Sequence, residues 1–390
     1  MVDKKFYPRL LGQPKQSFFL LGPRGTGKST WAKRTFPKAH VLNLLDEKIY
    51  QEHLSDAGLF SREMEALPNG SWVLLDEVQR LPYLLNEVHR YIEDKKLRFI
   101  LCGSSSRKLK TAGTNLLAGR ALKRVLHPFV PEELGDDFNL EEVLTTGSIP
   151  LIWQSESKKE TLEAYAQLYL KEEIQAEALV RNLGGFARFL PLAAHFHGQI
   201  LSIAALARDV GIPRTTVQGY IEILEDTLLA YRLPAFEGSL RVREKKHPKF
   251  YWIDPGLVQA FSHDMVRIDL KKNIRSKGAL FEGWVASTLR AYQAYRKTFD
   301  EFYYWAPADA QKTEVDFLLR KKNDFVAIEV KTTERLRPED LLGLKAISSL
   351  KGLKRRLMVC LVERSQKTSD GIEIVSVQNF LSILSRDNLF

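Results

Sequence analysis

Short apolar runs separated by polar, glycine-containing segments recur along the first third of the chain. Residues 17–21, 72–75 and 98–102 are apolar stretches of strand length, and polar segments long enough for helices lie between them. Short continuous apolar runs of this kind are typical of strands that are buried on both faces of a parallel sheet. The pattern therefore predicts an α/β domain with a doubly wound parallel sheet over residues 1–135.

The pattern of apolar positions changes twice farther along the chain. Residues 136–264 are expected to be mostly helical, and residues 265–390 return to a mixture of helices and strands. The strands expected in this last part lie near residues 302–305, 314–319, 325–331 and 357–362. The chain of 390 residues is therefore predicted to contain three domains, 1–135, 136–264 and 265–390.

The mostly helical part contains the pattern of a helix-turn-helix. Residues 201–210 are expected to form a helix capped by Ser202, Gly211 provides a tight turn, and residues 213–224 are expected to form a second helix. Apolar residues on each helix fall on the face that would meet the other helix. Two further strands would complete a winged helix, at residues 228–233 and 251–253.

A glycine-rich loop follows the first expected strand. Residues 22–29 read Gly-Pro-Arg-Gly-Thr-Gly-Lys-Ser, the complete G-x-x-x-x-G-K-S pattern, between a strand and a helix. In such a phosphate loop the backbone N–H groups converge on phosphate oxygens, Lys28 reaches the β- and γ-phosphates, and Ser29 offers its hydroxyl to Mg²⁺. A glycine-rich turn that contains a lysine by chance is the alternative. The nucleotide contacts predicted here come from Gly22, Gly25, Thr26, Gly27, Lys28 and Ser29.

Two carboxylates follow the second buried strand. Asp76 is predicted to hold the Mg²⁺ of a bound ATP, and Glu77 to orient and deprotonate the attacking water. The alternative is that both acids only open the next helix, where they would suit its dipole. Ser104, after the strand at 98–103, would sense the γ-phosphate or simply cap a helix. Arg120 would contact nucleotide, in cis or across a subunit boundary, or be an ordinary surface residue.

A second group of chemical residues lies in the last part of the chain. Asp316 lies near the start of one expected strand, and Glu329 and Lys331 lie two residues apart on the next, so that these two share a face. Asp316 and Glu329 would hold Mg²⁺, Glu282 on an upstream helix would add a contact, and Lys331 would position or activate water. This is the pattern of PD-(D/E)xK nucleases. The alternative is a nuclease fold that no longer cuts and only binds DNA or partners.

The order of these motifs resembles that of AAA-type ATPases, a class of P-loop NTPase. It is most similar to bacterial and archaeal ATP-binding proteins whose C-terminal half is a domain of unknown function. The resemblance implies an AAA-type core, a helical segment with a winged helix, and a PD-(D/E)xK nuclease-like domain. Because AAA-type sites usually lie between subunits, it also implies a homo-oligomer such as a hexameric ring. One departure is Val315 where the nuclease pattern has proline. The segments that carry the resemblance are 22–29, 74–77, 100–106, 119–120, 128–129, 147–150, 278–282, 314–317 and 328–331.

Composition favours a polyanionic partner and excludes some classes. The formal net charge is +10, which favours nucleic acid, and DNA in particular. No apolar run reaches the roughly 18 residues of a membrane-spanning helix, and the first residues lack the apolar core of a signal peptide. Cys102 and Cys360 are expected to be buried free thiols, so a cytoplasmic protein without structural zinc is expected. The residues expected to face DNA are Arg214, Thr215, Thr216, Gln218, Arg241, Arg243, Lys245, Lys246 and Lys249.

The function that these features predict is ATP-dependent work on DNA. We expect a protein that hydrolyses ATP with Mg²⁺ and binds and remodels DNA, with or without metal-dependent cleavage, in repair, recombination or defence. One alternative is a motor without cleavage, for junction migration or strand separation, whose C-terminal domain only grips DNA. The other is a nucleotide-dependent signalling or protein-interaction switch, in which the winged helix contacts protein.

Overall fold

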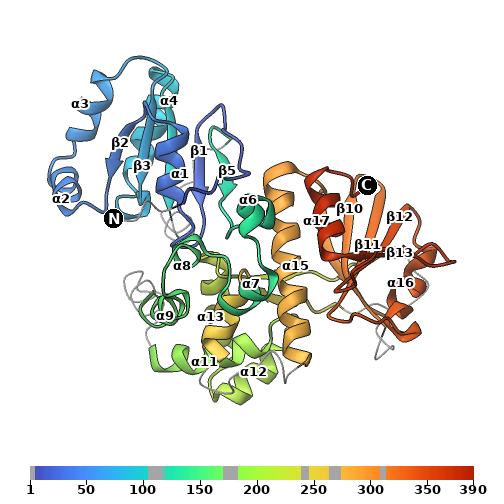
Figure 1. Cartoon of the computed structure of the whole chain (residues 1–390). Helices are drawn as coiled ribbons and strands as arrows, with labels where there is room; N and C mark the ends of the chain where they lie inside the picture. The colour runs from blue at the N-terminus through green and yellow to red at the C-terminus, as the bar shows by residue number, and fades with distance from the viewer. Residues whose placement is uncertain are drawn as a thin grey trace. The chain divides into compact units, whose positions relative to one another are not determined.

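The computed structural model divides the chain into two compact units. The first comprises Met1–Phe129, Ile149–Gln154 and Ile223–Leu229, and the second comprises Val130–Ser148, Ser155–Glu222 and Ala230–Phe390. Figure 1 shows the elements along the chain. The structure describes residues 5–103, 117, 119–169, 183–238, 246–262, 274–307 and 313–390.

The first unit is built on a five-stranded sheet with the strand order β2-β3-β4-β1-β5. Every neighbouring pair of strands in it is parallel. The strands are β1 (Phe18–Leu21), β2 (His40–Asn43), β3 (Trp72–Asp76), β4 (Arg98–Gly103) and β5 (Leu122–Val125). The helices between them are α1 (Lys28–Thr35), α2 (Glu47–Ser55), α3 (Leu59–Ala66), η1 (Val78–Arg80) and α4 (Leu84–Asp94). The predicted parallel α/β fold is therefore present.

Both faces of this sheet are covered by helices. Side chains alternate between the two faces along each strand, and here those on both faces are apolar. On one face, the ring of Phe18 packs against Trp31 of α1, with ring centroids 6.2 Å apart. On the other face, Phe19 and Leu75 belong to an apolar core that includes Phe60 of α3 and Val88 of α4. Burial on both faces explains why the strands are short continuous apolar runs rather than alternating ones.

The following part of the chain is mostly helical, as predicted. Its helices are α6 (Pro131–Leu134), η2 (Gly135–Asp137), α7 (Leu140–Thr146), α8 (Pro150–Trp153), α9 (Lys158–Ala164), η3 (Tyr165–Tyr169), α11 (Leu183–His195), α12 (Ile203–Val210), α13 (Arg214–Asp226) and α14 (Pro255–Ser262). A small three-stranded sheet has the order β6-β8-β7. Its strands are β6 (Gln199–Ile200), β7 (Ala230–Leu233) and β8 (Lys249–Trp252), and both pairings are antiparallel.

The helix, turn and helix predicted from the sequence are α12 and α13. Ser202 caps α12 by accepting a hydrogen bond from the backbone N–H of Ala205. Gly211 ends α12 with a φ of 72°, a left-handed conformation that favours glycine. Tyr220 of α13 is buried, and its ring packs edge-on against Phe186 with centroids 4.9 Å apart. Strands β7 and β8 follow these helices and pair antiparallel, and the winged helix itself stays a prediction.

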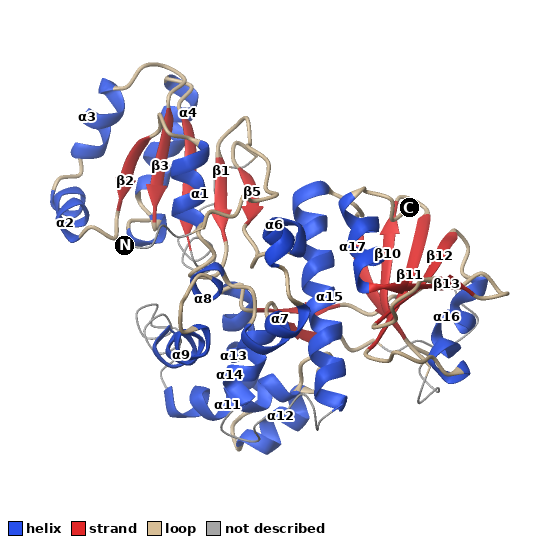
Figure 2. Cartoon of the chain, viewed as in Figure 1, coloured by secondary structure: helices blue, strands red, loops and turns tan. Residues whose placement is uncertain are grey.

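A mixed six-stranded sheet forms the last part of the chain, with the order β13-β14-β12-β11-β10-β9 (Figure 2). The strands are β9 (Glu301–Trp305), β10 (Val315–Lys321), β11 (Asp324–Lys331), β12 (Leu353–Cys360), β13 (Gln366–Lys367) and β14 (Glu373–Ser376). The helices are α15 (Ile274–Arg296), η4 (Pro338–Leu341), α16 (Leu342–Ala346), η5 (Ile347–Ser349) and α17 (Val377–Ser385). β9, β10 and β11 pair antiparallel, whereas β11, β12 and β14 pair parallel. The four strands predicted here are confirmed as β9 to β12.

The small sheet and the mixed sheet are joined by backbone hydrogen bonds within the second unit. Tyr304 of β9 accepts a hydrogen bond from the N–H of Phe236 at 2.7 Å and donates one to the carbonyl of Pro234 at 3.1 Å. The segment after β7 therefore extends the edge of the mixed sheet beside β9. This attachment places β8 next to the beginning of β10.

A buried carboxylate fixes the turn that follows α7. Asp254 accepts a hydrogen bond from the backbone N–H of Ser148 at 2.7 Å and one from the N–H of Gly256 at 2.8 Å. Gly147 has a φ of 79°, and a Cβ atom there would lie 1.8 Å from Oδ1 of Asp254. Burial raises the pKa of Asp254 to about 6 in spite of these hydrogen bonds. The requirement for glycine at position 147 is thus explained by packing around Asp254.

Two further observations bear on the sequence predictions. Cys102 and Cys360 are buried free thiols, as expected, and burial raises the pKa of both. Among the residues that the structure describes, none of the helices combines the length and the hydropathy needed to cross a membrane.

Candidate functional site

The phosphate loop connects β1 to α1 and has the backbone that its glycines permit. Gly25 and Gly27 have φ values of 77° and 84°, which side chains other than glycine rarely tolerate. At Gly22 a Cβ atom would lie 2.5 Å from the carbonyl oxygen of Leu126, so a side chain has no room there. Gly27 is the N-cap of α1 without a side-chain cap, which leaves the first N–H groups of the helix facing the loop. The loop therefore has the form that binds a phosphate group.

Lys28 is buried at the start of α1 and points back into the loop. Its ammonium group donates hydrogen bonds to the carbonyls of Gly22 at 2.7 Å and Pro23 at 3.1 Å. Thr26 also donates from its hydroxyl to the carbonyl of Pro23, at 2.7 Å. The loop thus holds Lys28 at its centre, where a β- or γ-phosphate would exchange with these carbonyls.

Asp76 and Glu77 lie at the same edge of the sheet as the phosphate loop, because the carboxyl ends of parallel strands share an edge. Asp76 ends β3 and is buried, and within the described part of the chain its Oδ1 atom has no hydrogen-bond partner. Glu77 has a φ of 57°, an unusual backbone conformation for this residue type, and accepts a hydrogen bond from the side chain of Gln79. Such backbone strain is frequent at functional sites.

The residues at this edge fit a magnesium ion. Mg²⁺ prefers oxygen ligands, and Ser29 and Asp76 supply a hydroxyl and a carboxylate. A buried carboxylate oxygen without a partner is costly unless a ligand satisfies it. Oδ1 of Asp76 is such an atom among the described residues, so a cation bound with nucleotide would satisfy it.

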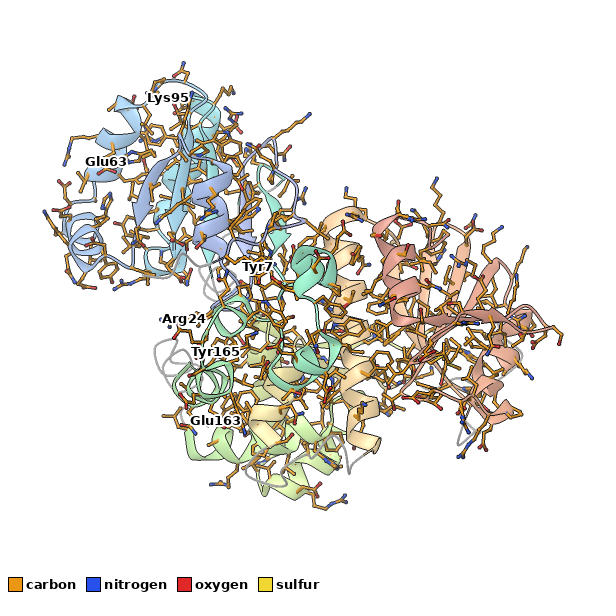
Figure 3. The ribbon with its side chains drawn as sticks, viewed as in Figure 1. Tyr7, Arg24, Glu63, Lys95, Glu163 and Tyr165 are labelled. Carbon is orange, nitrogen blue, oxygen red and sulfur yellow. The ribbon has the colours of Figure 1, made fainter. Side chains whose placement is uncertain are left out.

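Sequence reasoning missed two residues that support the loop. Arg9 donates hydrogen bonds to the backbone carbonyls of Thr26 at 2.8 Å and His127 at 2.5 Å. Tyr7, which is labelled in Figure 3, packs its ring against that of Phe129 with centroids 5.1 Å apart. Leu151 donates its N–H to the carbonyl of Gly25 at 3.0 Å. No local pattern marks these residues, because both reach the loop from distant parts of the sequence.

Of the two further residues predicted to contact nucleotide, the structure describes Arg120 but not Ser104. Ser104 lies outside the described residues, so its role as a γ-phosphate sensor stays a prediction. Arg120 precedes β5, at the edge of the sheet opposite the phosphate loop, and its side chain pairs with Glu93 at the end of α4. Within one chain Arg120 therefore lies away from the phosphate loop, which leaves two interpretations, a contact across a subunit boundary or an ordinary surface residue.

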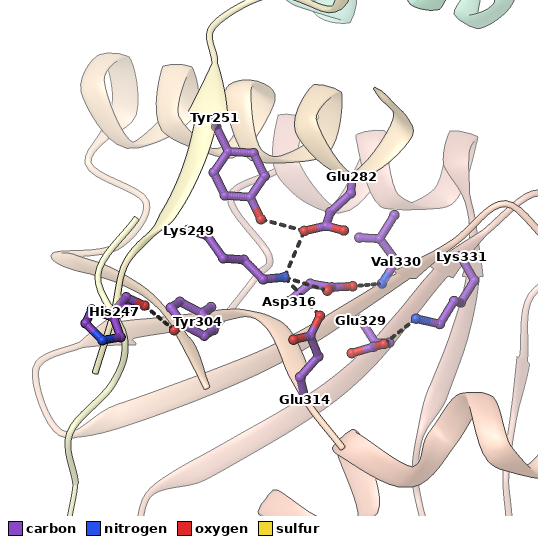
Figure 4. A network of polar contacts seen from close by, with 10 residues as sticks. All are labelled: His247, Lys249, Tyr251, Glu282, Tyr304, Glu314, Asp316, Glu329, Val330 and Lys331. Carbon is purple, nitrogen blue, oxygen red and sulfur yellow. Dashed lines mark hydrogen bonds and ion pairs between the residues drawn. The ribbon is translucent and has the colours of Figure 1, made fainter. Parts of the chain in front are cut away.

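The second group of chemical residues is brought together as predicted. Asp316 and Glu329 lie one residue beyond the antiparallel pairing of Phe317 with Ile328, where β10 and β11 separate. Asp316 accepts a hydrogen bond from the backbone N–H of Val330 at 2.9 Å, which replaces the missing ladder bond. Lys331 donates to Oε1 of Glu329 at 2.6 Å, and Glu282 on α15 faces the same cluster (Figure 4).

The structure places a further residue, Lys249, in this carboxylate cluster. Lys249 was predicted to lie on a basic wing facing DNA, and this is wrong, because its side chain is 2% exposed. The Nζ atom lies 3.0 Å from Glu282, 3.0 Å from Glu314 and 3.2 Å from Asp316 (Figure 4). The first residue of β8 thus supplies a positive charge to the carboxylates at the start of β10. Three other residues of the predicted basic surface, Arg241, Arg243 and Lys245, lie outside the described part of the chain.

Charge and burial set the protonation of this cluster. Burial, followed by the charge of Asp316, raises the pKa of Glu282 to about 7 and that of Glu329 well above its usual range. Burial also raises the pKa of Asp316, but the charges of Lys249 and Lys331 and the Val330 N–H lower it below its ordinary value overall. Burial disfavours the charge of Lys249, but the carboxylates hold its pKa well above the usual range. Lys249 is therefore a cation at neutral pH.

The residues of the second cluster do not fit a divalent metal ion in this arrangement. Glu282, Asp316 and Glu329 were predicted to hold Mg²⁺, but Lys249 makes hydrogen bonds to two of them and to Glu314. Among the described residues, no group of three or more histidine, cysteine or acidic side chains is arranged to hold a metal ion. The predicted metal site is thus present as a set of residues but filled by an ammonium group.

Three known families match successive parts of the chain. Residues 14–135 match the family described as AAA domain. Residues 137–267 and 277–380 match two families described as domains of unknown function, DUF8612 and DUF4143. The AAA match and the parallel sheet agree, and they confirm the predicted P-loop α/β fold of the N-terminal part. That part is an α/β domain similar to AAA domains, and it is followed by helical and sheet-containing domains.

Similar proteins add little about function. The uncharacterized proteins Mb2031c of Mycobacterium bovis and Rv2008c of Mycobacterium tuberculosis are each 26% identical over 377 residues, which cover 95% of this chain and 82% of the relative. The ORC1 protein of Aeropyrum pernix, solved in complex with DNA, has a TM-score of 0.27 and 14% identity over 65% of this chain and 88% of its own. Protein VC1899 from Vibrio cholerae has a TM-score of 0.23 and 12% identity over 95% and 96% of the two chains. TM-scores this low do not establish a shared overall fold.

Proposed function

We propose that this chain is an ATPase that uses Mg²⁺ and performs its work on DNA. The ATPase part of this proposal rests on the arrangement of Lys28 and Asp76 at the carboxyl ends of the parallel strands. A complete phosphate loop surrounds the ammonium group of Lys28, and a buried carboxylate oxygen of Asp76 lacks a partner among the described residues. A nucleotide phosphate with its cation satisfies both groups at once.

Each residue at this edge then has a separate task. Lys28 exchanges the carbonyls of Gly22 and Pro23 for β- and γ-phosphate oxygens, and the N–H groups at the start of α1 bind the remaining phosphate oxygens. Ser29 and Asp76 hold the cation, which when bound neutralises charge on the phosphates. Glu77 orients a water molecule and takes its proton as the water attacks the γ-phosphate. Gln79, whose amide donates to Glu77, holds that carboxylate in position.

The proposal that DNA is the substrate rests on charge and on α13. The chain carries a net charge of +10, and a polyanion is the partner that this charge attracts. Arg214 and Thr215 are exposed at the start of α13, the second helix of the proposed winged helix, where side chains reach phosphates or base edges. Gln218 is also exposed but bonds to Glu222 at 3.1 Å, so it is the weaker candidate for a base contact.

The experiment is ATP turnover by the purified chain without DNA and with single-stranded, duplex and branched DNA. We expect turnover to rise several-fold with at least one form of DNA. Turnover that no DNA changes, together with no DNA binding, would replace this proposal by the protein-interaction switch. In a matched binding assay, reversal of Arg241, Arg243, Lys245 and Lys246 to glutamate should weaken DNA binding and flatten its salt dependence, because fewer counterions are released. An unchanged salt dependence would remove the wing from the DNA surface.

We also propose that the chain acts as a homo-oligomer, such as a hexameric ring. The match of residues 14–135 to the AAA domain supports this, because AAA-type nucleotide sites usually lie between subunits, and Arg120 is the residue that would reach the nucleotide of a neighbouring subunit. Mass measurement in solution with and without ATP tests the proposal, and a monomer under both conditions would contradict it.

Among the alternatives, the position of Lys249 favours a motor whose C-terminal domain grips DNA without cutting it. An ammonium group bonded to Glu282, Glu314 and Asp316 occupies the place between these carboxylates that a catalytic cation would take. We expect no nicking of any DNA form by the wild-type chain with Mg²⁺ or Mn²⁺. Nicking that is lost in both Asp316→Asn and Lys331→Ala, with ATP turnover intact, would instead establish metal-dependent cleavage.

A further inference from the structure

Lys249 occupies the position in the carboxylate cluster where positive charge is most needed. Its Nζ atom lies within 3.2 Å of oxygen atoms from Glu282, Glu314 and Asp316 (Figure 4). An ammonium group has three N–H donors, and here three carboxylates accept them. Burying several carboxylates together is costly unless a cation is among them. The chain therefore supplies, from its own sequence, the charge that a bound metal ion would otherwise provide.

The strand that carries Lys249 is fastened on both sides of it. Two residues later on β8, on the same face of the strand, Tyr251 donates its hydroxyl to Oε1 of Glu282 at 2.5 Å. Two residues earlier, the carbonyl of His247 accepts a hydrogen bond from the hydroxyl of Tyr304 on β9. Lys249 itself pairs through its backbone with Ile200 and Leu233 in the centre of the small sheet. These contacts fix the position of the backbone on both sides of Lys249, and so they hold its ammonium group in the cluster.

A divalent cation and this ammonium group compete for the same atoms. A metal ion would take the oxygen atoms of Glu282, Glu314 and Asp316 at roughly 2.0–2.6 Å. The Nζ atom of Lys249 already lies at hydrogen-bond distance from each of these residues, and two cations so close together would repel each other strongly. Metal ion and lysine therefore exclude each other.

The cluster still contains carboxylate oxygens of the kind that bind divalent metal ions. Glu329 lies beside Asp316, and within the described part of the chain its Oε2 atom is buried without a hydrogen-bond partner. Carboxylate oxygens from two adjacent strands and from Glu282 on α15 are the ligand type that hard divalent cations prefer. The cluster thus retains the ligands for a cation but is filled by a lysine.

We propose that Lys249 is a resident cation that closes this cluster to divalent metal ions, and that the cluster binds one divalent ion once the lysine is removed. The closed state links β8 of the small sheet to β10 and α15. This inference is independent of the ATPase, because it concerns residues of the second unit and needs no nucleotide.

The experiment measures Mn²⁺ binding to the whole chain without nucleotide. Binding is detected by titration calorimetry and by the electron paramagnetic resonance signal of free Mn²⁺. Four proteins are compared: wild type, Asp316→Asn, Lys249→Met and Lys249→Met/Asp316→Asn. Methionine keeps the apolar stem of the lysine and removes its charge. We expect Lys249→Met to gain one Mn²⁺ per chain, at least tenfold tighter than any binding by wild type, and the double variant to lose it. Ions bound weakly at Asp76 contribute equally to all four.

Two results would overturn the proposal. One is an Mn²⁺ site in wild type that Asp316→Asn abolishes, which would show that metal and lysine coexist or that metal displaces the lysine. The other is a folded Lys249→Met variant without a new site, which would show that the cluster is only a structural ion-pair network. If Lys249→Met does not fold, the double variant Lys249→Met/Glu314→Gln takes its place, because it removes one positive and one negative charge from the cluster. The comparison of wild type with Asp316→Asn needs no change at Lys249. These Mn²⁺ measurements need no nucleotide, so their interpretation is the same whether or not the chain hydrolyses ATP.

Discussion

Asp254 fills the space beside Gly147 so closely that a methyl group on that glycine would lie 1.8 Å from its Oδ1 atom. Gly147 also has a φ of 79°, which disfavours other residues. Its neighbour Ser148 donates its N–H to the same carboxylate at 2.7 Å. The turn after α7 is therefore fixed by backbone conformation, by packing and by a buried hydrogen bond together.

Gly147→Ala should destabilise the chain strongly. Backbone strain costs roughly 1–3 kcal/mol and overpacking typically 1–3 kcal/mol, so we expect a loss of about 3 kcal/mol or more in the free energy of unfolding, measured in urea. Gly211→Ala is the matched control, because Gly211 has a similar φ of 72° but nothing within 4 Å of its missing Cβ. It should lose only roughly 1–2 kcal/mol. Equal losses in the two variants would show that the clash with Asp254 has no effect.

The buried carboxyl of Asp254 should make stability depend on pH. Burial raises its pKa from 3.8 to about 6 in the folded chain, so the folded state binds this proton more tightly than the unfolded state does. Its stabilising contribution is complete below the unfolded value and is lost as the pH rises through about 6. Since one pKa unit corresponds to about 1.4 kcal/mol, the loss between pH 4 and 7 should be up to about 3 kcal/mol.

Comparison with Asp254→Asn isolates this effect from the other carboxyl groups. The difference in unfolding free energy between wild type and variant should shrink as the pH rises across this range. A difference that stays constant from pH 4 to pH 7 would mean that Asp254 has an ordinary pKa.

Arg9→Ala should weaken ATP binding more than it slows hydrolysis. Arg9 holds the phosphate loop through the carbonyls of Thr26 and His127, and no chemical step is assigned to it. Hydrogen bonds from a charged group contribute roughly 1.5–3 kcal/mol, so we expect KM for ATP to rise about tenfold or more. Arg34→Ala is the control, since its guanidinium lies over the ring of Phe6 at the other end of α1. A fall in kcat with unchanged KM would place Arg9 in the chemistry instead.

Glu77→Gln should bind ATP normally and hydrolyse it slowly. The amide keeps the shape of the side chain but cannot take a proton from water, and general-base catalysis contributes typically 10²–10⁴-fold. Equilibrium binding of ATP and single-turnover hydrolysis measure the two effects separately. Loss of binding in a folded variant would indicate that Glu77, with its unusual φ of 57°, mainly supports the backbone of the loop.

The candidate phosphate site could be assembled from the sequence because its parts are local. Lys28 and Ser29 belong to one contiguous pattern, and Asp76 is marked by the apolar strand directly before it. Their common edge then follows from the rule that parallel strands end on the same side. Arg9 and Leu151 carry no such mark, because their contacts with the loop depend on how distant segments pack.

The second cluster shows where local reasoning ends. Asp316, Glu329 and Lys331 could be grouped because they lie on two consecutive strands. Lys249 reaches the same place from a different sheet, and its ion pairs with Glu314 and Asp316 span 65 and 67 residues. In the sequence it stands among other basic residues, which is the usual composition of an exposed wing. Glu314 had a weak signal, because it lies two residues before Asp316 and so projects to the same side of the strand.

The most direct test of the central claim is steady-state ATP turnover by Lys28→Ala beside wild type, with folding checked by circular dichroism. The account predicts Mg²⁺-dependent turnover by wild type and none above background by the variant, because the contact of Lys28 with the β- and γ-phosphates is lost. Full turnover by a folded Lys28→Ala variant would contradict the assignment of the phosphate loop and, with it, the proposed function.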